Sequence, residues 1–148
     1  MTNDTDATAE PSTAESAQRR ANFACLEGFF AALSRQDLEA ARPFCHDDFV
    51  LEMPYADPPV RLEGFEAYRA SVDVAFQTFV FELTLGETND CLDPDLLIVE
   101  YTSAGEAVPT GQPYANHYIG LWRFRDGRIT FGREFYNPDA ARKALTPA

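Results

Sequence analysis

The chain has 148 residues, of which 45% are hydrophobic and 13% are aromatic. This length and composition suit one globular domain with a sizeable core, and they exclude disorder as the global state. With 24 acidic and 12 basic residues the formal charge is −12, which argues against binding to nucleic acid or to an anionic membrane surface.

Cysteine usage and the N-terminal sequence indicate a compartment. Cys25, Cys45 and Cys91 are odd in number and lack metal-type spacing, so we expect reduced thiols in a cytoplasmic protein without a membrane-spanning segment. The start MTNDTDATAEPSTAE lacks the basic and apolar stretches of a signal peptide. We expect residues 1–14 to form a disordered acidic tail and residues 15–148 to form a single domain.

The first third of the chain predicts helices. The sequence STAE, from Ser12 to Glu15, matches a capping box, in which each side chain bonds an exposed amide at a helix start. A short helix, DLEAAR, must end near Pro43. Between these two features, apolar residues recur at helical spacing on one face: Phe23, Leu26, Phe30 and Leu33.

A strand, a loop and a second long helix are predicted next. The sequence DDFVLEMP is typical of a strand that Pro54 ends, and YADPPVRLEG is expected to be a loop. Gly64 then leads into a helix. Its apolar face comprises Phe65, Tyr68, Val72, Phe76 and Phe79.

The second half of the chain is mostly β in pattern. FELTLGE alternates apolar and polar residues, as a half-exposed strand does. DLLIVEYTS is richer in apolar residues and is expected to be a more buried strand. AGEAVPTGQP is expected to be a loop. Asp126-Gly127 predicts a tight turn between two final strands. Helices followed by antiparallel strands predict an α+β fold, with a curved sheet whose helices cover one face.

This order of elements resembles a known superfamily. The sequence AVPTGQPY, followed by GLWRFRDGRITFGREFYNP, is similar to SnoaL-like members of the nuclear-transport-factor-two-like superfamily, above all polyketide cyclases, limonene epoxide hydrolases and PhzA/PhzB proteins. The resemblance covers roughly Phe23 to Pro138 and implies a cone-shaped α+β barrel. It implies fold more than reaction, because these proteins catalyse unlike chemistries on one scaffold.

The resemblance carries over one catalytic acid. The acid in the last strand of the epoxide hydrolases and of PhzA/PhzB falls on Glu134. The arginine and second aspartate of the epoxide hydrolases fall on Tyr101 and Ser103, the PhzA/PhzB histidine falls near Ser71, and the ketosteroid-isomerase aspartate falls on Met53. Each of the three mechanisms therefore lacks a component in this chain.

Strand alternation assigns faces to the final hairpin. One face mixes glycine, aromatic and polar residues and is expected to form a cavity wall: Asn116, Tyr118, Gly120, Trp122, Glu134 and Tyr136. The opposite face is apolar, which predicts a homodimer formed through it: Ile119, Leu121, Phe131 and Phe135. His117 falls on this second face.

Glu134 has two readings. It can be a solvated strand residue paired with neighbouring arginines, or a cavity carboxylate whose raised pKa suits acid–base catalysis. Face parity and the resemblance favour the second. Asp57 and Tyr136 are further catalytic candidates, and the predicted substrate-binding residues are Met53, Tyr55, Tyr101, Ser103, Asn116, Tyr118, Gly120 and Trp122.

These residues predict a small enzyme that needs no cofactor and no metal. It would hold an apolar polyketide- or terpenoid-like metabolite and catalyse cyclisation or isomerisation by positioning and proton transfer. Epoxide opening and a non-catalytic, dimeric small-molecule-binding protein remain as alternatives. No nucleotide fingerprint, phosphate loop or metal-ligand cluster is present in the sequence.

Overall fold

The protein is described by a computed structural model covering residues 12–148. Residues 1–11 of the predicted tail lie outside the described residues. The elements in chain order are α1 (Thr13–Ser34), α2 (Leu38–Ala41), the 3-10 turn η1 (Arg42–Phe44), β1 (Cys45–Met53), β2 (Val60–Glu63), α3 (Phe65–Thr78), β3 (Phe79–Asp90), β4 (Leu96–Ala107), β5 (Pro113–Arg125), β6 (Arg128–Phe135) and α4 (Pro138–Leu145).

The start of α1 follows the predicted cap. The Ser12 hydroxyl accepts a hydrogen bond from the backbone N–H of Glu15 at 3.1 Å, which satisfies one of the free amides at the helix start. The helix therefore begins at Thr13, two residues before the predicted domain boundary. Leu26 and Phe30 are buried on its inner face, as the helical spacing predicts.

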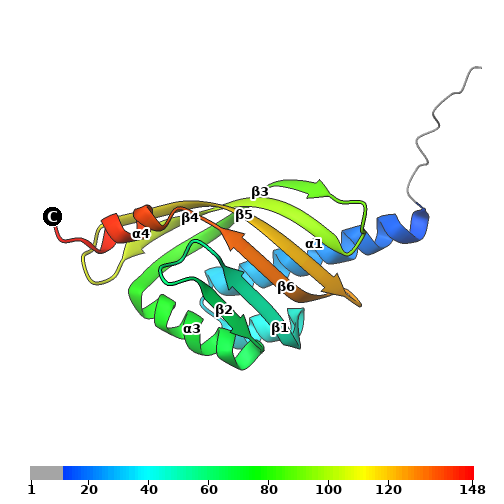
Figure 1. Ribbon diagram of the computed structural model, residues 1–148, viewed down its shortest axis with the longest axis horizontal. Helices are drawn as coiled ribbons and strands as arrows, with labels where there is room; N and C mark the ends of the chain where they lie inside the picture. The colour runs from blue at the N-terminus through cyan, green and yellow to red at the C-terminus, as the bar shows by residue number, and fades with distance from the viewer. Residues whose placement is uncertain (1–11) are drawn as a thin grey trace, which may run out of the picture.

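Six strands form one curved sheet in the order β2-β1-β6-β5-β4-β3. Neighbouring strands are antiparallel except β1 and β6, which are parallel. The sheet does not close on itself, because β2 and β3 remain as its two edges. Helices α1 and α3 lie on the same side of the sheet (Figure 1), which confirms the predicted α+β arrangement.

Three boundaries predicted from the sequence are wrong. Val60–Glu63 is not loop but the edge strand β2, paired with β1; four residues are too short a run for alternation to be recognised. Phe79 does not end α3 but begins β3, paired with Ala107. The predicted loop AGEAVPTGQP is shorter than expected, because β4 continues to Ala107 and β5 already begins at Pro113.

Helix α4 was not predicted. The Asn137 side chain caps it by accepting from the N–H of Asp139 at 3.0 Å, and Pro138 occupies its first turn. It packs against β5 and β4 at the far end of the sheet, around buried Ala144 and Tyr114. Within residues 12–148 no helix is both long and apolar enough to cross a bilayer.

The main core lies between the helices and the concave face of the sheet, and it is unusually aromatic. Phe29, Phe49, Phe65, Tyr101 and Trp122 each retain 2% or less of their accessible surface. Packing is less complete along the second half of α3, whose apolar side chains are only half-buried. A cavity beneath that half of the helix explains the difference.

Candidate functional site

A partly open cavity of about 270 Å³ lies between the helices and the concave face of the sheet. Apolar side chains from α1 and α3, including Phe30, Val72 and Phe76, form one wall. The sheet contributes the other wall, and from it come Tyr118, Trp122, Glu134 and Tyr136. These four side chains share a face because β5 and β6 alternate regularly here, and Gly120 pairs with Glu134 across the two strands.

The carboxylate of Glu134 has a single hydrogen-bond partner among the described residues. The phenol of Tyr101, on β4, donates to Oε2 of Glu134 at 2.5 Å. Tyr101 is 1% exposed, whereas Glu134 keeps part of its surface because the cavity reaches it. No lysine, arginine or histidine of residues 12–148 lines the cavity, so the carboxylate has no counter-ion there.

Burial sets the proton affinities in this site. Desolvation raises the pKa of Glu134, and the hydrogen bond from Tyr101 opposes that rise. Desolvation also raises the pKa of the Tyr101 phenol well above its ordinary range, and the nearby charge of Glu134 adds to this. The phenol therefore stays protonated, and Glu134, with its pKa above the ordinary glutamate value, is the candidate acid–base group of the cavity.

The hydrogen bond between Tyr101 and Glu134 depends on a glycine in the strand between them. A Cβ atom at Gly120 would lie 2.8 Å from the Tyr101 hydroxyl and 2.4 Å from Nε1 of Trp122. Only glycine lets both side chains pack over β5 at this point. Nε1 of Trp122 is buried over Gly120 beside the Tyr101 hydroxyl, inside the protein rather than at the cavity surface.

A second polar group continues along the sheet. The Tyr118 ring stacks on Tyr101 with centroids 4.9 Å apart and an interplanar angle of 8°. Its hydroxyl lies 3.0 Å from Oγ of Ser103 and 3.3 Å from the hydroxyl of Tyr114. Sequence reasoning did not select Tyr114, although it lies one alternation step before Asn116 on the same strand face.

Both polar atoms of the Asn116 side chain form hydrogen bonds within the protein. Its Nδ2 donates to the Tyr114 hydroxyl at 3.1 Å and to the carbonyl of Asn137 at 2.8 Å. Its Oδ1 accepts from the backbone N–H groups of His117 and Asn137, both at 3.0 Å. Asn116 is 7% exposed and lies behind the cavity wall, where it fixes Tyr114 and the chain entering α4.

Comparison with protein families identifies the domain. The family model described as a SnoaL-like domain matches residues 26–131, which is more than half of the chain. The chain belongs to the SnoaL-like family. A PhzA/B-like protein of Pseudomonas aeruginosa, itself uncharacterised, is 37% identical over 110 residues, 71% of this chain and 78% of that protein. YesE of Bacillus subtilis, also uncharacterised, is 30% identical over 123 residues, 81% of this chain and 84% of that protein.

Solved structures share the fold of this SnoaL-like domain. A Bacillus subtilis protein to which an isomerase function has been ascribed is 26% identical with a TM-score of 0.81, over 86% of this chain and 94% of that one. A Xanthomonas campestris protein ascribed a polyketide-cyclase function is 18% identical, with a TM-score of 0.76 over 87% and 99%. An LEH-like epoxide hydrolase of M. tuberculosis is 21% identical, with a TM-score of 0.69 over 85% and 90%. These likenesses confirm the resemblance seen in the sequence.

Several residues selected from the sequence lie away from the cavity of the SnoaL-like domain. Asp57 is exposed in the turn between β1 and β2 and does not line the cavity. Tyr55, in the same turn, is 61% exposed and packs against Phe135 on the convex face, with ring centroids 5.4 Å apart. Met53 does line the cavity. The structure therefore gathers the sheet residues around Glu134 and leaves this turn outside.

Residues missed by sequence reasoning come mainly from the helices. Phe30 of α1 meets the Tyr101 ring edge-on at 4.7 Å, and Tyr68 and Ser71 of α3 line the cavity opposite the sheet. Helical spacing did predict Phe30 and Tyr68 as inward-facing. It could not distinguish a side chain that fills the core from one that borders a cavity.

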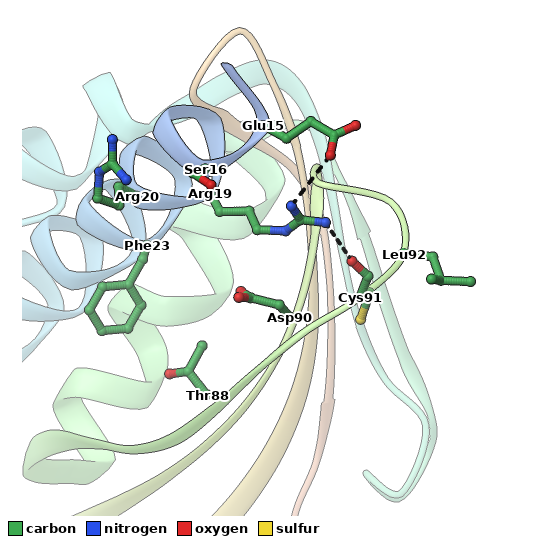
Figure 2. Close-up of a pocket in the computed structure, with 9 residues that line it drawn as sticks. All are labelled: Glu15, Ser16, Arg19, Arg20, Phe23, Thr88, Asp90, Cys91 and Leu92. Atoms are coloured by element: carbon green, nitrogen blue, oxygen red, sulfur yellow. Dashed lines mark hydrogen bonds and ion pairs between the residues drawn. The ribbon is translucent and has the colours of Figure 1, made fainter. Parts of the chain in front are cut away.

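A second, larger depression lies at the start of α1 and the end of β3. It is an open groove in which charges of both signs pair with one another. Figure 2 shows Arg19 between Glu15, 3.8 Å away, and the carbonyl of Cys91, to which it donates at 2.9 Å. Leu92 at its rim is fully exposed. The groove lacks an enclosed reactive group, so the candidate site is the cavity around Glu134.

Proposed function

We propose that this SnoaL-like protein is a small, cofactor-independent enzyme. It holds an apolar metabolite of polyketide or terpenoid type and catalyses cyclisation or isomerisation through acid–base proton transfer by Glu134. One observation carries the proposal. A carboxylate with no counter-ion among residues 12–148 faces an apolar cavity, and a single phenol holds it in place.

The proposed chemistry follows from this arrangement. One oxygen of Glu134 accepts from Tyr101, and the other has no partner within the described residues, so it can take a proton from a substrate carbon. The phenol of Tyr136, which lines the cavity, is available to hold a substrate oxygen. The apolar walls would fold the substrate into a reactive conformation.

Epoxide opening by water has weaker support. Activation of water by a relay needs a second acid or an arginine beside the first, and Glu134 contacts a phenol instead. Glu134 is also the only charged side chain that lines the cavity among residues 12–148. A relay of two acids therefore cannot be assembled around it from the described cavity residues.

We also propose that the protein forms a homodimer through the convex face of the sheet. Ile119 is 45% exposed there, and Leu121, Phe131 and Phe135 are half-buried beside it. Together with exposed Tyr55 they make an apolar surface on the face that no helix of residues 12–148 covers. Removing such a surface from water would favour association.

The catalytic proposal is tested by hydrogen exchange. Candidate apolar ketones would be incubated with the protein in D₂O, and incorporation of deuterium next to the carbonyl would be followed by NMR. Glu134→Gln keeps the shape of the side chain and its bond from Tyr101, and the exchange rate should fall about a hundredfold or more. Glu82→Gln, on an exposed position of β3, is the control and should leave the rate unchanged. Full activity in Glu134→Gln would show that Glu134 does not carry the proton transfer, and no exchange in the unaltered protein would instead fit a non-catalytic binding protein.

A further inference from the structure

The distribution of charge in the cavity bears on the kind of molecule that can occupy it. Twenty residues line the cavity, and Glu134 is the only carboxylate among them. An anionic ligand would meet a carboxylate of its own sign in an apolar enclosure, with no lysine, arginine or histidine from the described chain to offset it. Carboxylate and phosphate ligands are therefore disfavoured.

The aromatic rings around Glu134 add an attraction for positive charge. Phenols from four parts of the fold feel the charge of Glu134: Tyr68 on α3, Tyr101 on β4, Tyr118 on β5, and Tyr136 after β6. The Tyr118 and Tyr136 rings lie 6.0 Å apart at 37°, and the Trp122 ring lies 6.5 Å from that of Tyr101. The faces of such rings carry partial negative charge and attract cations.

We propose that the ligand of this cavity is an apolar cation, an iminium or ammonium compound whose positive nitrogen lies beside Glu134 and the surrounding rings. This inference rests on the proposed function and names the charge class of its substrate. The ligand would supply the counter-ion that the protein itself does not place next to the carboxylate. Ion pairing then offsets the desolvation of Glu134, which no neutral ligand can do.

A cationic substrate also suits the proposed proton transfer. When Glu134 takes a proton from the carbon next to an iminium group, the C–H electron pair forms a C=C bond and the nitrogen recovers its lone pair. Carboxylate and cation both become neutral, so no charge remains to be solvated in the apolar cavity. Deprotonating a neutral ketone would instead leave an enolate, for which the described cavity offers no positive side chain.

Three probes of matched shape separate the charge classes. They are (3-hydroxyphenyl)trimethylammonium, its uncharged carbon analogue 3-tert-butylphenol, and the anion 3-hydroxybenzenesulfonate. Affinities would be measured by calorimetry between about pH 5 and pH 7, where phenols stay protonated. We expect the cation to bind about tenfold more tightly than the neutral probe, and the anion to show no measurable binding.

Two further measurements tie the preference to Glu134. In Glu134→Gln the ratio of cation to neutral affinity should fall to about threefold or less, the share left to the rings, whereas Glu82→Gln should leave the ratio unchanged. In the unaltered protein, affinity for the permanently charged cation should rise with pH as Glu134 loses its proton, while affinity for the neutral probe stays flat. The phenols that face Glu134 do not titrate in this range, because burial raises the pKa values of all four.

The outcomes distinguish this inference from the proposed function. Equal affinities for cation and neutral probe, a ratio that survives Glu134→Gln, or failure of all three probes to bind would overturn the cationic ligand. Each could occur in a protein that still exchanges hydrogen on neutral ketones. A cation preference that depends on Glu134, in a protein without exchange activity, would support the inference and overturn the catalytic proposal.

Discussion

Glu52 on β1 and Glu134 on β6 are glutamates on neighbouring strands of one sheet, in opposite environments. Glu52 lies on the convex face, where it accepts from Nε of Arg133 at 2.7 Å and also pairs with Arg61. The hydrogen bond from Arg133 is the main reason that its pKa is lowered. Glu134 lies on the concave face with a phenol as its partner, and burial raises its pKa.

The difference arises from a single step along one strand. Arg133 pairs with Glu52 in the sheet register, and the next residue is Glu134 on the other face. Both acids have the same intrinsic chemistry, so the environment of each face decides whether the pKa of its glutamate is raised or lowered. Arginine neighbours keep Glu52 ionised as a structural partner, while the cavity holds Glu134 as the candidate acid–base group.

Among the substitutions that test the contrast between Glu52 and Glu134, Gly120→Ala is expected to have the largest effect. The new methyl group would overlap the Tyr101 hydroxyl and Nε1 of Trp122, so Tyr101 must move away from Glu134. We expect turnover to fall about a hundredfold through the loss of this positioning. Unfolding free energy should fall by about 1–3 kcal/mol, as is usual for an overpacked core. Denaturant unfolding and the exchange assay measure the two effects.

Gly132→Ala is the matched control. Its methyl group would meet the Trp122 ring at 2.6 Å and Leu51 at 3.0 Å, and its three nearest atoms do not include Tyr101. This variant should therefore lose similar stability while its folded fraction keeps more of its turnover than Gly120→Ala does. Equal losses of turnover in the two variants would mean that packing of Trp122, rather than the Tyr101–Glu134 contact, is what activity requires.

A smaller effect is expected on the pH dependence of folding stability, and its sign follows from the pKa of Glu134. The pKa of Glu134 is higher in the folded protein than in the unfolded chain, so stability falls as pH rises from the ordinary glutamate pKa through the raised value. Glu134→Gln does not titrate and should become progressively more stable than the unaltered protein over that window. The gain is about 1.4 kcal/mol for each unit by which the pKa is raised.

Glu52→Gln should show the opposite sign. The pKa of Glu52 is lowered in the folded state, so its contribution is present above the ordinary glutamate pKa and is lost as pH falls through the lowered value. This variant should be slightly less stable than the unaltered protein near neutral pH, and water and salt reduce the effect at this partly exposed site. Unfolding curves recorded at several pH values test both variants. Parallel pH profiles for the two would show that the faces do not differ as described.

The faces of the hairpin could be predicted because its geometry is local. Asp126 and Gly127 both have positive φ, as the predicted tight turn requires, and alternation runs unbroken through the residues that line the cavity. The shift in register between β5 and β6 lies between Arg123 and Phe124, beyond the cavity wall. For this reason counting along the strands placed Glu134 and Trp122 on one face.

Other features depend on contacts between distant segments. That Tyr101 meets Glu134 depends on the register of three strands and on the missing side chain of Gly120 between them, and no local pattern encodes either. Asp57 was selected because it lies near the end of a strand, but the turn carries it into solvent. Strand β2 and helix α4 are too short for their periodicity to be recognised.

The smallest effect on the protomer is expected from Ile119→Lys, which tests the convex face. Ile119 is already 45% exposed, so the substitution should change the unfolding free energy of a monomer by no more than about 0.5 kcal/mol. In a homodimer it would place a charge in the apolar interface without a partner, which should shift the mass measured by sedimentation towards the monomer. Glu82→Lys, on the exposed part of β3, changes charge without touching this surface. An unaltered protein that sediments as a monomer would show that the apolar convex face stays in contact with water. The two faces of the sheet would then differ only in the environments of Glu52 and Glu134.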